Sequence, residues 1–484
     1  MALSERGFSA MALLLCLGAG CGARTGLLVG DRDHHDGDAD GDADSDTDSD
    51  APWDADVPPC SLDWAGDPFS IIAFPEGGAN APDLVLLDPG DPEAGGALVV
   101  LKAISADANF WHPEIRVARL VNGLDWPDGV VMDRQPTLFG FESHEWGSIS
   151  LAAGDATRLA LFWHYAGALV DPPSLRFQTF DLESWSASSP VDVSLEEGHE
   201  ASLGLSPGRG VDLAGAGYAG NGYGVAFRTW RETEGTLPQA AILNPEGSFQ
   251  LGPFPAAPPG EYPGRGASIV WTGTTYLVAT SFIDCPEGWE GRCAPGAVGV
   301  LRIRPPIAPG DPGGLELVST IPVQRPGLNP LRPHMAERAG SVWLSWFEVD
   351  PAVPGVAANV VLARVSGDGF TEWDEPRILA TDAAYAASPA IAATAHGIIV
   401  MWGAPGDASL PPETPGSTRL VVHHLDFDGV AVQGPLVADT TSFAYYADLT
   451  AVGLAGPAGV LLAWSARGES QRDEIFLGRL DCVW

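Results

Sequence analysis

One pattern of strands and turns recurs along the chain after residue 60 and constrains the fold more than any other feature. In each copy an extended stretch ends in a tight glycine turn, and a second, more apolar stretch follows, often closing on Trp. A variable loop, a third strand and a short fourth strand complete the copy. Clear copies are SISLAAGDATRLALFWHY, ASIVWTGTTYLVATSF and HMAERAGSVWLSWF, which begin at residues 148, 267 and 334. Short strands separated by glycine turns predict an all-β chain.

The turn glycines set the number of copies. They recur about every 60 residues, and they are Gly96, Gly154, Gly222, Gly273, Gly340, Gly397 and Gly459. A single sheet of four short strands cannot bury both of its faces, whereas a ring of such sheets can. The pattern resembles a β-propeller of seven blades with four strands each, and it is loosely similar to sialidase-like and other secreted propellers.

The two ends of the repeat region complement each other. The last copy stops at EIFLGRLDCVW, after its third strand, and residues 60–73 form a strand without a copy of their own. We therefore expect this N-terminal strand to complete the last blade and to bring Cys60 close to Cys482. Four cysteines of the mature chain allow three pairings; we expect Cys60 to pair with Cys482, and Cys285 with Cys293.

The first 59 residues indicate export. Residues 1–20 hold an apolar run of signal-peptide length, and LGAGC resembles the lipobox of bacterial lipoproteins, which implies a lipid on Cys21. An ordinary secretory signal is the alternative. Residues 21–59 are rich in Asp, so charge repulsion predicts a disordered linker that holds the folded part, residues 60–484, away from a membrane. The resemblance implies a cell-envelope protein, anchored in the outer membrane by lipid alone.

The acidic charge limits the partners and cofactors. The formal net charge of −38 disfavours nucleic acid as a partner. The stretch DGDADGD resembles the start of a calcium-binding loop, but position twelve counted from Asp36 is Thr47, where a bidentate Glu is required. We expect no cofactor, apart from weak Ca²⁺ association with the linker.

Several short motifs resemble catalytic or metal sites without the context these sites need. GAGYAG at 215–220 fits a dinucleotide fingerprint but leads into a strand, and GLSPG at 204–208 places Pro207, which has no N–H, where an oxyanion hole needs a donor. SGDGFTEW at 366–373 resembles a shortened Asp-box, a structural turn of sialidases. Adjacent His423 and His424 face opposite sides of a strand. We therefore expect no catalytic residues and no metal site.

The loops between second and third strands are long and varied, so they are the candidate binding surface. Trp residues that end second strands are predicted to pack between blades. The favoured function is a non-enzymatic, monomeric binding module for a surface protein or glycan; the alternative is a hydrolase or lyase acting on polysaccharide. The candidate binding residues are Trp111, His112, Tyr165, Arg231, Glu232, Trp289 and Arg467.

Overall fold

The computed structural model describes the repeat region as strands and short turns. Apart from a few single turn residues, the described parts are 60–71, 78–87, 96–104, 113–121, 131–133, 149–155, 158–165, 174–181, 186–193, 200–201, 214–218, 222–231, 235–256, 267–283, 296–305, 310–338, 340–351, 358–383, 389–394, 396–407, 417–438, 449–453, 458–467 and 473–483. The predicted signal peptide, Cys21, the linker and the Cys285–Cys293 pair lie outside them.

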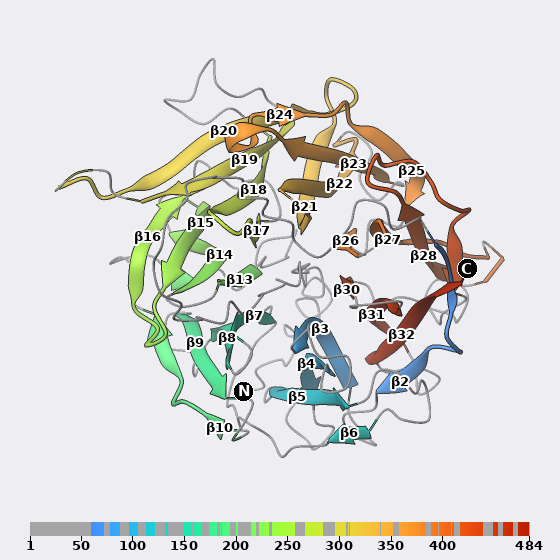
Figure 1. The fold of residues 1–484 in the computed structure, drawn as a ribbon, viewed down its shortest axis with the longest axis horizontal. Coiled ribbons are helices and arrows are strands. Elements are labelled where there is room, and N and C mark those ends of the chain that lie inside the picture. Colours follow the sequence, from blue (N-terminus) through green and yellow to red (C-terminus); the bar gives the residue numbers. More distant parts are fainter. Residues whose placement is uncertain are drawn as a thin grey trace, which may run out of the picture.

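The described strands pair into seven antiparallel sheets, as many as the copies in the sequence (Figure 1). The first sheet holds β3 (Gly78–Leu87), β4 (Gly96–Ile104), β5 (Pro113–Val121) and β6 (Val131–Asp133). The second holds β7 (Ile149–Asp155), β8 (Arg158–Tyr165), β9 (Ser174–Asp181), β10 (Ser186–Ala187) and β11 (Val191–Val193). The third holds β12 (Glu200–Ala201), β13 (Ala214–Tyr218), β14 (Gly222–Arg231), β15 (Gly235–Leu243) and β16 (Phe249–Pro255).

Four more sheets follow along the chain. The fourth holds β17 (Ala267–Trp271), β18 (Tyr276–Phe282), β19 (Ala297–Arg304) and β20 (Gly314–Pro322). The fifth holds β21 (Asn329–Arg338), β22 (Ser341–Val349), β23 (Ala358–Ser366), β24 (Glu372–Trp373) and β25 (Arg377–Ala383). The sixth holds β26 (Ala390–Ala393), β27 (Ile398–Pro405), β28 (Thr418–Leu425) and β29 (Leu436–Ala438). The last combines β30 (Leu449–Gly453), β31 (Ala458–Arg467) and β32 (Asp473–Val483) with β1 (Ser61–Trp64) and β2 (Phe69–Ile71).

One strand of each sheet lies nearest the middle of a closed ring, and we number the strands of a sheet outwards from this inner strand as first to fourth (Figure 1). Going round, β3 contacts β7, and contacts continue through β13, β17, β21, β26 and β30, which in turn contacts β3. Among the described residues the one helical element is a short 3₁₀ turn at Asp368–Phe370, and no helix there is long and apolar enough to cross a membrane. The predicted all-β propeller is confirmed.

The N-terminal strand closes the ring as predicted. β1 pairs antiparallel with β32, with Leu62 opposite Cys482, and a disulfide joins Cys60 to Cys482 over a sequence separation of 422. The side chain of Gln433, from the neighbouring sheet, accepts a 2.6 Å hydrogen bond from the Leu62 N–H and donates a 2.8 Å bond to the Leu62 carbonyl. The first and last strands are therefore fixed to each other covalently and to the next sheet by hydrogen bonds.

The core lies between neighbouring sheets, where one sheet's face packs on the next. Trp464 of β31 packs with Ile399 and Met401 of β27, and Trp402 of β27 packs with Phe347 and Val360 of the preceding sheet. The predicted packing role is confirmed for these Trp, and Trp163 and Trp346 are equally buried. The Trp230 side chain is outside the described residues. Fully burying such a side chain contributes several kcal/mol, and removing one typically costs about 3–5 kcal/mol.

Gly459 has a different role from the turn role predicted for it. Gly273 and Gly340 lie in first-to-second turns at positive φ, as expected, but Gly459 lies inside β31. A Cβ on Gly459 would lie 2.4 Å from the Leu480 carbonyl oxygen and 2.9 Å from Cδ2 of Leu62. The glycine is therefore required by close packing against β32 and the closing strand β1 rather than by a turn.

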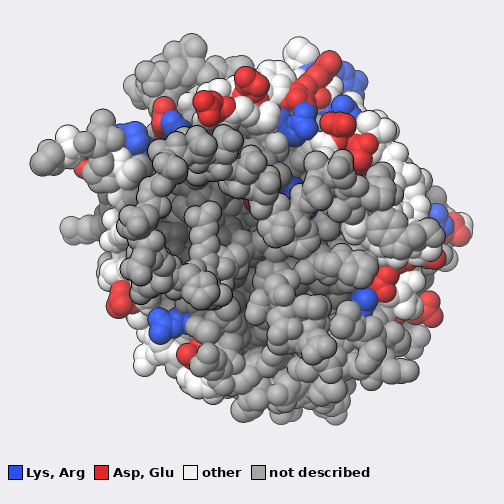
Figure 2. Space-filling model, viewed as in Figure 1, with Lys and Arg blue, Asp and Glu red and all other residues white. Residues whose placement is uncertain are grey.

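Charged side chains among the described residues gather at the outer rim of the ring, with both signs interspersed (Figure 2). The outer strands carry ion pairs such as Arg302–Glu316 at 2.6 Å and Arg364–Asp374 at 2.9 Å. Partly exposed pairs of this kind contribute little to stability. The packing between sheets and the closure of the ring are what hold the scaffold.

Candidate functional site

Strand direction divides the ring into two faces. Because the strands of each sheet alternate in direction from the middle outwards, second-to-third hairpins open on the same face as the connections from a fourth strand to the next first strand. We call this side the recognition face. The first-to-second and third-to-fourth turns lie on the opposite side, which we call the turn face.

Three of the predicted binding residues end second strands at the recognition face. They stand opposite the first residue of the third strand, where the hairpin loop begins: Tyr165 opposite Ser174, Arg231 opposite Gly235, and Arg467 opposite Asp473. The backbone therefore places all three at the predicted face. Their side chains, and Trp111, His112, Glu232 and Trp289 altogether, lie outside the described residues, so a binding role for the seven stays a prediction.

A buried polar cluster on this face surrounds Glu348 at the end of β22. The Glu348 side chain is 1% exposed. Its Oε1 accepts a 2.9 Å hydrogen bond from the backbone N–H of Gln324 and a 3.3 Å bond from the indole N–H of Trp346. Asn359, the first polar residue of β23, stands opposite Glu348 in the strand register. We call these four residues the Glu348 cluster.

Burial shifts the pKa of Glu348. Loss of solvent raises the pKa of this carboxyl, and the hydrogen bonds from Gln324, Trp346 and Asn359, together with the charge of Arg325, only partly offset the effect. The cluster joins elements that are distant in sequence, because Gln324 lies in the connection between β20 and β21 and its side-chain amide also donates to the Pro376 carbonyl at 2.9 Å. The cluster therefore fixes the base of one hairpin of the recognition face to the neighbouring connection.

Strain accompanies this cluster on the inner strand of the same sheet. The β21–β22 register shifts between Leu331 and His334, and Arg332 within that bulge has a φ of 54°, which non-glycine residues seldom adopt. Arg332 and His334 are both buried. Burial, and secondarily the charge of Arg332, lower the pKa of His334 to about 3, so its ring is neutral at physiological pH.

The bulge recurs across the ring and is tied to the adjacent sheet. The Ser268 hydroxyl of β17 accepts a 3.3 Å hydrogen bond from the N–H of Met335. In β3 the register shifts between Asn80 and Asp83, and the buried Asp83 Oδ1 accepts a 2.9 Å bond from the Leu84 N–H. Both bulges contain a proline, Pro82 or Pro333, which removes one ladder donor.

Motifs set aside in the sequence have structural roles where they are described. Residues 215–218 of GAGYAG lie in β13, which pairs antiparallel with β14, and the Asp-box-like segment contains the 3₁₀ turn between β23 and β24. His423 lies edge-on to Trp402 at 6.1 Å between ring centroids. His424 faces the other side, with Nε2 3.3 Å from the His396 carbonyl oxygen. GLSPG lies outside the described residues.

Sequence reasoning did not find two features of the described structure. The Glu348 cluster gave a weak signal, an acidic residue two positions after a strand-ending Trp. The sequence contains no signal for the position of His396 beside the Cys60–Cys482 disulfide, because this position depends on three segments that meet only when the ring closes. Both features arise from long-range contacts rather than from local pattern.

Comparison with known proteins identifies no family. No family and no curated protein matches the chain. Among solved structures, a Dyadobacter fermentans protein of unknown function has a TM-score of 0.48 at 10% identity, covering 87% of this chain and 99% of its own. A NanB sialidase mutant from Streptococcus pneumoniae has a TM-score of 0.40 at 10% identity, covering 88% and 70%. A mutant Aleuria aurantia lectin in complex with α-methyl-L-fucoside has 0.40 at 10% identity, covering 76% and 96%. At these values none indicates a ligand or activity for this chain.

Proposed function

We propose that the protein is a cell-envelope binding module whose recognition face binds a surface protein or a glycan without chemical conversion. In this proposal Cys21 carries a lipid that anchors the chain in the outer membrane, and the acidic linker, residues 21–59, holds the ring away from the bilayer. The ring itself works as a monomer, with binding groups supplied by the second-to-third hairpins.

The observation that carries the proposal is the arrangement of these hairpins on one face of a closed scaffold. Seven sheets present their second-to-third strand ends on the same side, and a disulfide between the first and last strands prevents the ring from opening. Loops held on a rigid scaffold lose little conformational freedom on binding, which favours recognition.

The chemistry of the hairpins supports a sugar or a cationic group as the ligand. The candidate residues combine aromatic rings with charged groups, as in Trp111 and His112 or Arg231 and Glu232. Aromatic faces stack on sugar rings and attract cations, and neighbouring carboxylates accept hydrogen bonds from hydroxyl or ammonium groups. The Glu348 cluster supports this role by fixing the backbone from which one hairpin projects.

A glycan and surface-protein binding screen tests the proposal. The mature chain with Cys21→Ser, which removes the lipid, is screened for retention of glycans and for their cleavage. Retention without new reducing or unsaturated ends is expected, whereas turnover would favour the polysaccharide hydrolase or lyase instead.

Matched variants of one sheet locate the binding face. Glu232 begins the β14–β15 loop on the recognition face, and exposed Glu246 lies in the β15–β16 turn on the turn face. Each replacement by Ala removes one carboxylate from the same sheet. Glu232→Ala is expected to weaken retention of the ligand several-fold, whereas Glu246→Ala leaves it unchanged. Weaker retention by Glu246→Ala alone would place the ligand on the turn face.

A further inference from the structure

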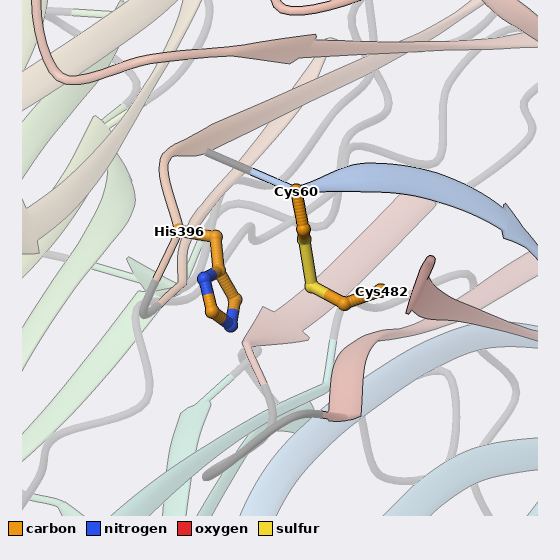
Figure 3. A group of neighbouring side chains, drawn as sticks. All are labelled: Cys60, His396 and Cys482. Atoms are coloured by element: carbon orange, nitrogen blue, oxygen red, sulfur yellow. A yellow bond between two sulfur atoms is a disulfide. The ribbon is translucent and has the colours of Figure 1, made fainter. Parts of the chain in front are cut away.

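The closing disulfide has a third potential metal ligand beside it. The ring of His396 lies next to the bond between Cys60 and Cys482 (Figure 3). One ring nitrogen and the two Sγ atoms all lie within 4.8 Å of one another. Two sulfurs and an imidazole are a common ligand set for zinc, and in the oxidised protein the sulfurs are bonded to each other instead.

The three side chains come from three separate segments on the turn face. Cys60 precedes β1, Cys482 lies near the end of β32, and His396 lies in the turn between β26 and β27 of the neighbouring sheet. Cys60 and His396 are buried, and Cys482 is half-buried. Cys482 therefore leaves a route for a small ion or oxidant, while the other two ligands are shielded from water.

The position of His396 is fixed by its own turn. The Thr394 hydroxyl accepts a 3.0 Å hydrogen bond from the His396 N–H and donates a 3.0 Å bond to the Gly397 carbonyl. The His396 carbonyl in turn lies 3.3 Å from Nε2 of His424. A Cβ on Gly397 would lie only 2.1 Å from the Leu425 carbonyl oxygen, so the turn packs tightly on β28. A ligand held this way needs little reordering to bind an ion.

We propose that, before the disulfide forms, Cys60, Cys482 and His396 bind one zinc ion that holds the ends of the ring together. The dithiol is the form in which the chain is synthesised, and a dithiol reductant regenerates it. Zn²⁺ replaces the two thiol protons, which pass to solvent, and a neutral imidazole nitrogen supplies the third ligand; no electrons are transferred. A disulfide-containing oxidant later accepts two electrons from the thiolates by thiol–disulfide exchange. The Cys60–Cys482 bond then forms, the oxidant takes up two protons and leaves as a dithiol, and the zinc ion is released.

The distances fit such a site once the sulfur–sulfur bond is absent. Zinc binds sulfur at about 2.3 Å and imidazole nitrogen at about 2.0–2.1 Å, so ligand atoms of one tetrahedral site lie roughly 3.5–4 Å apart. Here the imidazole nitrogen lies within 4.8 Å of both sulfurs, and the two sulfurs are free to move apart once the bond between them is reduced. Three protein ligands leave the fourth position for water. Because the ligands come from both chain ends, zinc binding would favour the closed ring.

Zinc titration of the full chain tests the proposal, with a competing chromophoric chelator as the readout. The phosphine-reduced protein is expected to bind one more equivalent of zinc than the oxidised protein. This difference cancels weak binding to the acidic linker, which both forms contain. Cobalt added to the reduced protein is expected to give tetrahedral absorption with a thiolate charge-transfer band, a readout that needs no variant.

Variants separate this site from other cysteines and histidines. His396→Ala is expected to lower zinc affinity of the reduced protein at least tenfold, whereas the matched control His423→Ala leaves it unchanged. The Cys285→Ser/Cys293→Ser variant is expected to keep the additional zinc. Equal zinc binding by reduced and oxidised protein, cobalt spectra without thiolate bands, or loss of the ion only in the Cys285/Cys293 variant would each overturn the proposal.

Discussion

Removing the Cys60–Cys482 disulfide should cost more stability than removing any short-range crosslink of this chain. Closing a loop with a sequence separation of 422 reduces the entropy of the unfolded chain by an amount worth about 6 kcal/mol at 25 °C in the chain-entropy treatment. The predicted Cys285–Cys293 disulfide closes a loop of about nine residues, for which the same treatment gives about 2.6 kcal/mol. The expected difference is therefore about 3 kcal/mol.

Guanidinium unfolding of two double variants measures this difference. Cys60→Ser/Cys482→Ser removes the closing disulfide but keeps the pairing of β1 and β2 with β32, and Cys285→Ser/Cys293→Ser is the control of equal chemistry. The sixteen Trp, several of them buried between sheets, report unfolding by fluorescence. The first variant should lose about 4–6 kcal/mol and the control about 2–3 kcal/mol.

Which of the two double variants loses more free energy of unfolding tests the role of the closing disulfide. If the closing disulfide variant lost less than the control, the ends of the ring would not be constrained in the way the structure shows. A lowered midpoint with unchanged m-value would locate the effect in stability rather than in a change of the surface exposed on unfolding.

Three further perturbations follow from named contacts. The pKa of His334 falls from 6.5 to about 3 on folding, so on acidification the unfolded chain takes up a proton before the folded chain does. The free energy of unfolding should therefore decline by up to about 1.4 kcal/mol per pH unit between these two values. Denaturant titrations of His334→Gln should show a weaker dependence of the free energy of unfolding on pH. Glu348→Gln should match or exceed the wild-type melting temperature near pH 8, since the amide oxygen can keep both Oε1 bonds without a buried charge, whereas Glu348→Ala should lose about 1–3 kcal/mol; equal losses would contradict this. Gly397→Ala should destabilise the protein far more than Gly340→Ala, because a Cβ on Gly340 would meet no atom within 4 Å. Equal drops in melting temperature for the two variants would refute the packing argument.

The architecture was accessible from sequence because it depends on local repetition. Each copy carries a glycine at or near its first-to-second turn and an apolar second strand, and the unpaired strand at 60–73 together with an incomplete last copy predicts closure. Detail at the closure was less accessible: the segment forms two strands, β1 and β2, which both pair with β32. The turn role predicted for Gly459 is wrong, because its contact with Leu62 exists only after the ends meet.

The candidate site was only partly accessible. Strand ends such as Tyr165 and Arg231 could be placed because loop position follows from strand order. The Glu348 cluster and the position of His396 could not, since each joins segments from different parts of the chain, and the hydrogen bonds that fix them are set by packing between sheets. Burial also lowers the pKa of His334 and raises that of Glu348, and burial at that level is a property of the ring rather than of any stretch of sequence.

Non-reducing peptide mapping of the oxidised protein tests ring closure most directly. The account predicts one crosslinked peptide pair that joins the segment around Cys60 to the C-terminal segment around Cys482. A pair joining Cys60 to Cys285 or Cys293 would contradict it, because the first strand could not then complete the last sheet.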